Sequence, residues 1–229
     1  MNVSGHTLDL FGPSEAALRT GAAAPPPPER LADGAVLLRG FALADEALWR
    51  EALDAIVQAA PLQQMVTPGG HTMQVRTTSC GTWGWTSAES GYRYARLNPL
   101  TGQPWPALPE AFRRLAHDAA ALAGFPGFDP DACLVNRYAP GTRLSLHQDR
   151  HERDLRQPVV SVSWGVPAVF LFGGLQRSDR ALRLTLQHGD VLVWGGPARL
   201  RFHGVMPIAP AHHPAFGPDR VNLTFRRAF

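Results

Sequence analysis

The feature that most constrains the fold is a series of short alternating segments that runs from residue 132 to the end of the chain. Turns such as Ala139-Pro140-Gly141 and His188-Gly189-Asp190 separate them. The expected strands are 133–138, 143–149, 159–164, 168–172, 182–186, 191–194, 200–203 and 221–226. Strands this short, with turns this frequent, favour a double-sheet jelly roll, so we expect a catalytic or binding core over about 132–229.

The part of the chain before this core predicts one strand and two helices. A candidate strand covers 35–38, and Asp45 is a plausible N-cap for the first helix, whose inward face includes Trp49 and Ile56. The second helix follows Pro109 and ends near Gly124. Its expected inward residues are Phe112, Leu115, Ala116, Ala119 and Leu122. The fold class is therefore α+β, mainly β, with N-terminal helices.

Residues 1–30 are expected to form a flexible segment rich in proline and alanine. The proline run at 25–28 has fixed φ angles and no backbone donors, so it suits neither a helix interior nor a sheet. No internal repeat is evident, and we expect a single domain over 31–229.

Residues 61–106 differ in composition from the core because they are rich in glycine, threonine, proline and aromatic residues. Two interpretations stand side by side. Aromatic residues such as Trp85 and Tyr92, beside Arg93, would suit a lid that stacks on bases and touches phosphates. Alternatively, a β-hairpin lid would use these rings only to cover a small core.

The composition constrains the partners and the location of the protein less than the motifs constrain its fold. The formal net charge of +3 permits an anionic partner without requiring one. Two cysteines, Cys80 and Cys133, are too few for a disulfide framework or a zinc site. No apolar run is long enough to cross a bilayer and no secretory signal pattern is present, so the cytoplasm is the expected location. A monomer is expected as well.

One imidazole and one carboxylate mark a candidate metal site. If 143–149 is a strand, its period of two places His147 and Asp149 on the same face. With His203 from a distant strand, they would form the 2-His-1-carboxylate set that binds non-haem Fe(II). Taken singly, each has a plainer interpretation: a solvated pair on a surface strand, or an interior histidine with its hydrogen bonds satisfied.

The last expected strand carries an anion-binding pattern. Arg220, Asn222 and Arg226 share one face of it, and guanidinium groups are suited to bidentate binding of carboxylates. A small dicarboxylate that chelates the metal at one end would satisfy this face.

These motifs together resemble the AlkB family of Fe(II)- and 2-oxoglutarate-dependent dioxygenases, and the resemblance runs from about residue 31 to 226. It implies a double-stranded β-helix (jelly-roll, cupin-like) core with a β-rich nucleotide-recognition lid. It also implies Fe(II) at His147, Asp149 and His203, with 2-oxoglutarate and O2 as co-substrates. Arg226 would clamp the distal carboxylate of 2-oxoglutarate. The other matching co-substrate positions are Asn136, Tyr138, Arg220 and Asn222.

The resemblance further implies oxidative demethylation of 1-methyladenine and 3-methylcytosine in DNA, preferably single-stranded. The base is restored directly, and formaldehyde, succinate and CO2 are released. Expected substrate contacts are Met65, Thr67, Trp85, Tyr92, Arg93, Tyr94, His151 and Arg177. His151 and Thr77 depart from the family pattern, which leaves the preference among methylated and etheno bases open. In the family, a carboxylate at the position of His151 could accept a hydrogen bond from the amino group of the base. Here the imidazole would need a suitable protonation state to do so, or Glu152 would accept this hydrogen bond instead.

Other functions remain compatible with the sequence. The same chemistry could act on RNA, a protein side chain or a small molecule. A jelly roll can also be a non-catalytic binding module that holds a metal, although such a module would not need Arg220 and Arg226 on one strand face.

Overall fold

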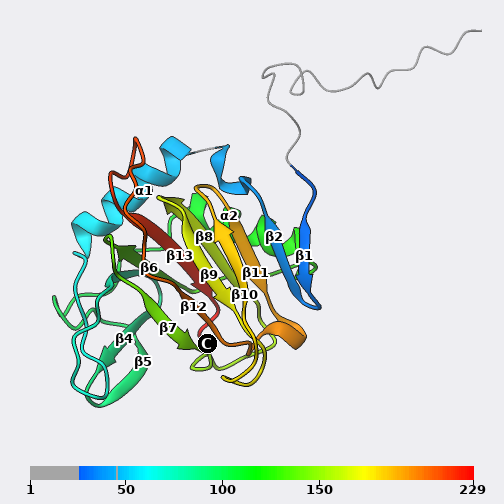
Figure 1. Cartoon of the computed structure of the whole chain (residues 1–229). Helices are drawn as coiled ribbons and strands as arrows, with labels where there is room; N and C mark the ends of the chain where they lie inside the picture. Colours follow the sequence, from blue (N-terminus) through cyan, green and yellow to red (C-terminus); the bar gives the residue numbers. More distant parts are fainter. Residues whose placement is uncertain (1–25, 45) are drawn as a thin grey trace, which may run out of the picture.

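The computed structural model describes residues 26–44 and 46–229, which form two antiparallel sheets that face each other, with two helices over the larger one (Figure 1). The expected mainly β jelly roll is confirmed. Most of the segment expected to be flexible, and the proposed N-cap Asp45, lie outside the described residues. Within them, no helix has both the length and the apolar character needed to cross a membrane.

The larger sheet has seven strands in the order β1-β2-β11-β8-β13-β6-β3. Their bounds are β1 Glu29–Ala32, β2 Ala35–Leu38, β3 Arg76–Gly81, β6 Ala132–Tyr138, β8 Val159–Gly165, β11 Val191–Trp194 and β13 Arg220–Arg226. Strand β13 lies at the centre, paired with β8 on one side and β6 on the other. The arginine-bearing strand is therefore in the middle of the sheet, where every side chain is buried.

The smaller sheet has four strands in the order β10-β9-β12-β7. Their bounds are β7 Leu144–His147, β9 Ala168–Phe172, β10 Leu182–Leu186 and β12 His203–Val205. Between the two sheets lies an apolar core that includes Phe170, Phe172 and Trp194. Because β7 and β12 are neighbours in this sheet, the two histidines of the candidate metal site meet although they are distant in sequence.

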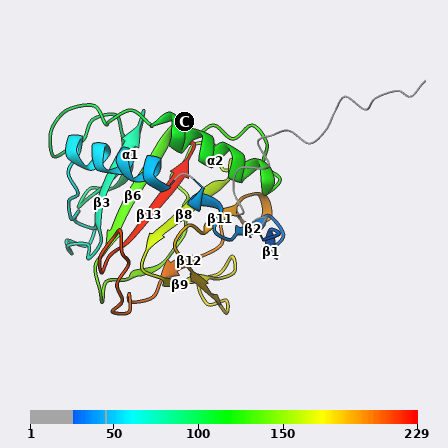
Figure 2. The same cartoon turned by 90° about the horizontal axis from the view of Figure 1, so that it is seen from above.

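The two helices, α1 Glu46–Ala59 and α2 Glu110–Leu122, lie over the outer face of the larger sheet (Figure 2). They bury Trp49, Ile56 and Phe112 in a second core against Trp164 and Phe225. One expectation for α2 is wrong: Leu122 is 58% exposed, and Ala120 is buried with Ala119 instead. Two short 3-10 turns complete the elements, η2 Phe41–Leu43 and η3 Gly196–Ala198.

A separate two-stranded hairpin, β4 Gly84–Ala88 and β5 Gly91–Ala95, stands at one side of the sheets (Figure 1). It falls within the span expected to form a lid. The same span also contains β3, which differs from the expectation by pairing with β6 at the edge of the larger sheet. Thr77, Thr78 and Ser79 of β3 are buried there despite their polar side chains.

Two expected strand boundaries near the site are wrong. Strand β7 ends at His147, so Asp149 lies in the loop beyond it. Strand β12 begins at His203, where the expected strand 200–203 ended. Residues 199–202 follow η3, and the Phe202 backbone bonds to the loop residues Gly173 and Gly174 rather than to a strand partner. At the other end of the chain, β1 starts at Glu29, inside the segment expected to be flexible.

Candidate active site

The three expected metal ligands converge on one point. His203 lies directly opposite His147 in the β12–β7 register, and the centroids of their rings are 4.4 Å apart. Asp149 lies 3.8 Å from His147 (Oδ1 to Nε2) and 3.7 Å from His203 (Oδ2 to Nε2). One ligand atom from each residue lies within 4.8 Å of the others, and among the described residues no other histidine, cysteine or acidic group completes such a cluster.

Hydrogen bonds fix how the two imidazoles face this point. Nδ1 of His147 lies 2.9 Å from the carbonyl oxygen of Ser145, and Nδ1 of His203 lies 3.0 Å from that of Arg201. A carbonyl can only accept, so each Nδ1 carries a proton and each Nε2 faces the shared point. Backbone carbonyls orient metal-binding histidines in this way in many proteins.

Gly204 allows the two strands to approach closely beside the ligands. A Cβ atom at this position would lie 2.7 Å from the carbonyl oxygen of Leu144 and 3.1 Å from the backbone nitrogen of Leu146. Backbone atoms cannot move aside as a flexible side chain can, so a larger residue would push β12 away from β7. The glycine after His203 is therefore part of what places His203 against His147.

Arg226 forms a buried ion pair with Asp149, the metal-binding carboxylate. Its Nη2 and Nε donate to Oδ2 of Asp149 at 2.6 and 2.9 Å. Burial by itself would raise the pKa of Asp149, but Arg226, followed by the two imidazoles, outweighs burial and lowers it well below its usual range. Burial, and next the proximity of His147, lowers the pKa of His203 to about 3. Both groups are therefore in the forms that bind a metal, a carboxylate and a neutral imidazole.

Arg220, at the other end of β13, is a buried cation with unused donors. Its Nη2 donates to Oγ of Ser163 at 3.0 Å, and its guanidinium carbon lies 5.1 Å from the centroid of the Tyr138 ring. Its Nε and Nη1 have no hydrogen-bond partner among the described residues. Burial lowers the pKa of Arg220. An arginine only 1% exposed with two free donors is suited to bind an anion.

The other expected co-substrate residues lie around Arg220. Asn136, Tyr138 and Asn222 line the same cavity, and the register pairs Tyr138 with Arg220 and Asn136 with Asn222. The amide of Asn222 is occupied: it donates to Oγ of Ser161 and to the carbonyl oxygen of Val162, both at 2.8 Å. Asn222 therefore braces β13 against β8, whereas the free donors belong to Arg220.

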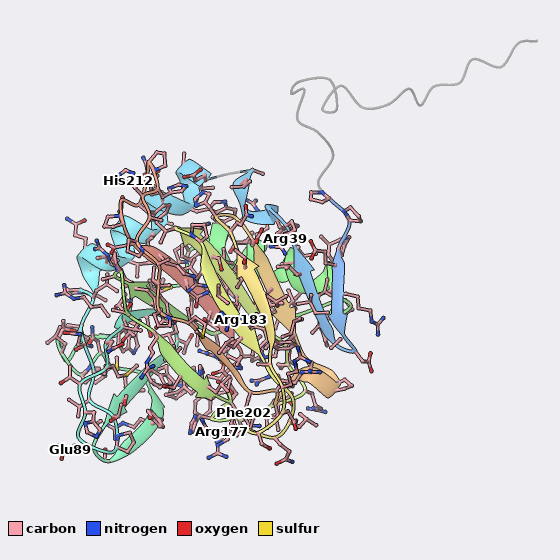
Figure 3. All side chains as sticks on the ribbon, viewed as in Figure 1. Arg39, Glu89, Arg177, Arg183, Phe202 and His212 are labelled. Atoms are coloured by element: carbon pink, nitrogen blue, oxygen red, sulfur yellow. The ribbon has the colours of Figure 1, made fainter. Side chains whose placement is uncertain are left out.

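The cavity has a volume of about 830 Å³ and reaches from the metal ligands to the hairpin. Five of the expected substrate residues line it: Thr67, Trp85, Tyr92, His151 and Arg177. The rings of Trp85 and Tyr92 are stacked with centroids 5.5 Å apart, and the ring centroid of His151 lies 5.7 Å from that of Tyr92. The guanidinium carbon of Arg177 lies 4.9 Å from the centroid of the Phe202 ring, and Figure 3 shows these two side chains together.

The other three expected contacts do not reach the cavity. Met65 is buried beneath the hairpin, where its sulfur lies 3.2 Å from the backbone nitrogen of Ser87. Arg93 is exposed on the hairpin and is absent from the cavity lining. The hydroxyl of Tyr94 donates to Glu152 at 2.5 Å. Burial raises the pKa of Tyr94 well above its ordinary value, so the phenol stays protonated.

Sequence reasoning missed a buried ion pair behind the site. Arg199 donates to Glu152 (Nη2 to Oε2, 2.9 Å) and to the carbonyl oxygen of Asp149 (2.5 Å). Because Glu152 is fully engaged with Arg199 and Tyr94, it cannot replace His151 as a contact for a substrate. Thr77 does not line the cavity but is buried next to Asn136 in the β3–β6 register.

The residues fit the metal and the co-substrate that the sequence motifs imply. Two imidazoles and one carboxylate on one side of an open cavity are typical ligands for non-haem Fe(II). The unpaired donors of Arg220 fit a carboxylate at the far end of a small dicarboxylate.

Comparisons with known proteins agree with this geometry. The profile of the 2OG-Fe(II) oxygenase superfamily matches residues 34–226. The chain is 55% identical to the Alpha-ketoglutarate-dependent dioxygenase AlkB of Escherichia coli K12, over 96% of this chain and 98% of the relative. It is 46% identical to the AlkB homolog of Caulobacter vibrioides NA1000, over 78% and 80%. The solved structure of OsALKBH1 superposes with a TM-score of 0.75 at 31% identity, covering 88% of this chain and all of that one.

Proposed function

Because the chain belongs to the AlkB family within the 2OG-Fe(II) oxygenase superfamily, we propose that it removes N-methyl groups from damaged bases in DNA. It is an Fe(II)- and 2-oxoglutarate-dependent dioxygenase. The single observation that carries the substrate proposal is the cavity, which joins the metal ligands to a stacked pair of aromatic rings on the hairpin. One domain over 31–229 would hold both parts.

His147, Asp149 and His203 would hold the iron, which with 2-oxoglutarate and O2 supplies the oxidising power to hydroxylate a C–H bond. A hydroxylated N-methyl group is a hemiaminal. It eliminates formaldehyde and leaves the base intact, while 2-oxoglutarate is converted to succinate and CO2.

We assign the two arginines of β13 different roles. The free Nε and Nη1 of Arg220, beside Tyr138, support Arg220 as the anchor for the distal carboxylate of 2-oxoglutarate. Arg226 already donates twice to Asp149, so we propose that it keeps this ligand ionised and oriented. This proposal differs from the role that the family resemblance implied for Arg226. Asn136 would complete the pocket, while Asn222 would hold β13 against β8.

Trp85 and Tyr92 are the proposed contacts for the base, and His151 and Arg177 also line the cavity. A base can reach the metal only after leaving the helical stack, and single-stranded DNA lowers that cost by a few kcal/mol. We therefore propose single-stranded DNA as the preferred substrate and the cytoplasm, where DNA is accessible, as the location. A monomer would suffice because one chain supplies the whole site.

Succinate formation in the presence of competing substrates tests this proposal. The purified protein would be given Fe(II), 2-oxoglutarate and O2 with a single-stranded DNA bearing one 1-methyladenine, the same sequence as RNA, or a methylated lysine peptide. We expect the DNA to stimulate succinate formation and to lose its methyl group. Stimulation by the RNA alone or by the peptide alone would contradict the DNA proposal while leaving the enzyme class intact.

A further inference from the structure

The aromatic residue at position 229 contacts the base of the lid hairpin. The ring of Phe229 stacks on that of Trp83 with centroids 4.0 Å apart and an interplanar angle of 27°. Trp83 directly precedes β4, which carries Trp85. The guanidinium carbon of Arg96, which directly follows β5, lies 4.7 Å from the centroid of the Trp83 ring. Both ends of the hairpin therefore meet at Trp83.

Phe229 also contacts the loop that contains the metal-binding carboxylate. The guanidinium carbon of Arg153 lies 5.0 Å from the centroid of the Phe229 ring, and the backbone nitrogen of Arg153 donates to the carbonyl oxygen of Ala228 at 2.9 Å. Arg153 comes four residues after Asp149 and two after His151. One side chain thus lies between the hairpin and the 149–153 loop.

Asp131 holds the backbone of this segment in place. Its carboxylate accepts from the backbone nitrogens of Ala228 (2.6 Å) and Phe229 (3.1 Å). Its carbonyl oxygen accepts from the backbone nitrogen of Trp83 at 3.2 Å. Charge-assisted hydrogen bonds to two consecutive amides leave residues 228 and 229 little freedom, so the Phe229 ring is held against Trp83.

We propose that Phe229 is a positioning residue for the demethylation reaction. Its ring fixes the base of the hairpin, so that Trp85 and Tyr92 face the metal site across the cavity when a nucleic acid binds. This rests on the proposed function for its substrate. Phe229 does not line the cavity, so it would act through its contacts with Trp83 and Arg153.

The hairpin has other attachments that would survive the loss of Phe229. Tyr94 is bonded to Glu152, and Nε1 of Trp105 donates to the carbonyl oxygen of Ala95 at 2.9 Å. Phe229 is itself 41% exposed, so its truncation removes little core packing. We therefore expect Phe229→Ala to fold with a hairpin that is present but less constrained.

The test compares steady-state kinetics on the methylated single-stranded oligonucleotide with amide hydrogen exchange of residues 82–96. Phe229→Ala should raise the KM for the oligonucleotide about five-fold, which corresponds to about 1 kcal/mol and is typical of one aromatic pair. It should leave kcat and the KM for 2-oxoglutarate near those of the wild type, and should speed exchange in the hairpin. Phe229→Tyr, which retains the ring, should restore the wild-type KM for the oligonucleotide and the wild-type exchange rate of the hairpin.

The matched control is Leu122→Ala, which truncates an exposed apolar side chain on α2. It should change neither the KM for the oligonucleotide nor the hydrogen exchange of the hairpin. A wild-type KM for the oligonucleotide in Phe229→Ala, whatever its melting temperature or exchange, would overturn the proposal and leave Phe229 a purely structural role. If the wild type itself does not demethylate the oligonucleotide, the proposed function fails. Unchanged exchange in Phe229→Ala would then overturn the positioning role separately.

Discussion

Replacing Arg220 tests how the co-substrate is anchored. Arg220 is buried, and its Nε and Nη1 have no partner among the described residues. A hydrogen bond to a charged group contributes about 1.5–3 kcal/mol. Arg220→Lys keeps the charge but loses the planar fork, so at least one such bond is lost. We expect the dissociation constant of 2-oxoglutarate to rise about 10- to 150-fold.

An anaerobic titration of the Fe(II)-loaded protein with 2-oxoglutarate, followed by its weak visible charge-transfer band, measures this constant. Arg226→Lys is the matched control on the same strand. Because Arg226 contacts Asp149, that change should weaken Fe(II) binding more than 2-oxoglutarate binding. If Arg220→Lys binds 2-oxoglutarate as the wild type does while Arg226→Lys does not, the division of roles is refuted.

Three further predictions follow from the packing and charges around the site. Gly204→Ala places a Cβ 2.7 Å from the Leu144 carbonyl oxygen, so it should lower stability by about 1–3 kcal/mol and weaken Fe(II) binding, as thermal melts with and without metal would show. Arg199→Met removes the closer of the two buried arginines that pair with Glu152 and leaves only Arg226, at 3.5 Å, so it should lower the free energy of unfolding in urea by about 3 kcal/mol. Arg30→Met, at an exposed pair, should change it by less than about 1 kcal/mol. Because burial lowers the pKa of His203 from 6.5 to about 3, unfolding takes up a proton in this interval, so the melting temperature of the metal-free protein should fall as the pH drops from about 6.5 towards 3. A melting temperature that stays level or rises over that interval would contradict the assignment.

The metal site could be predicted from the sequence because it depends on local spacing. His147 and Asp149 are two residues apart, and their side chains meet even though β7 ends before Asp149. His203 could be assigned from the family pattern, although the strand expected at 200–203 ends where β12 begins. The backbone carbonyls that accept from Nδ1 of each histidine could not be predicted, because they depend on how the chain bends at the strand end.

The roles of Arg220 and Arg226 could not be read from the sequence. A period of two places both on one face but does not say which end of the strand lies near the metal, and six residues of strand span roughly 20 Å. Only the pairing of β13 with its neighbours brings Arg226 to Asp149.

Two other features of the structure could not be predicted from the sequence because polar residues form them. β3 was expected in the lid because its sequence has few apolar residues, yet it is buried at the edge of the larger sheet. The Arg199–Glu152 pair looks like two surface charges in the sequence, because nothing local marks a charge whose partner is 47 residues away.

Mass analysis of one oligonucleotide tests the central claim most directly. A single-stranded DNA with one 1-methyladenine would be incubated with Fe(II), 2-oxoglutarate and O2, and formaldehyde would be measured in the same samples. We predict that the wild type removes the methyl group with an equal amount of formaldehyde released, and that His147→Ala does neither. Methyl loss by His147→Ala, or none by a wild type that still converts 2-oxoglutarate to succinate, would contradict base demethylation at this metal site.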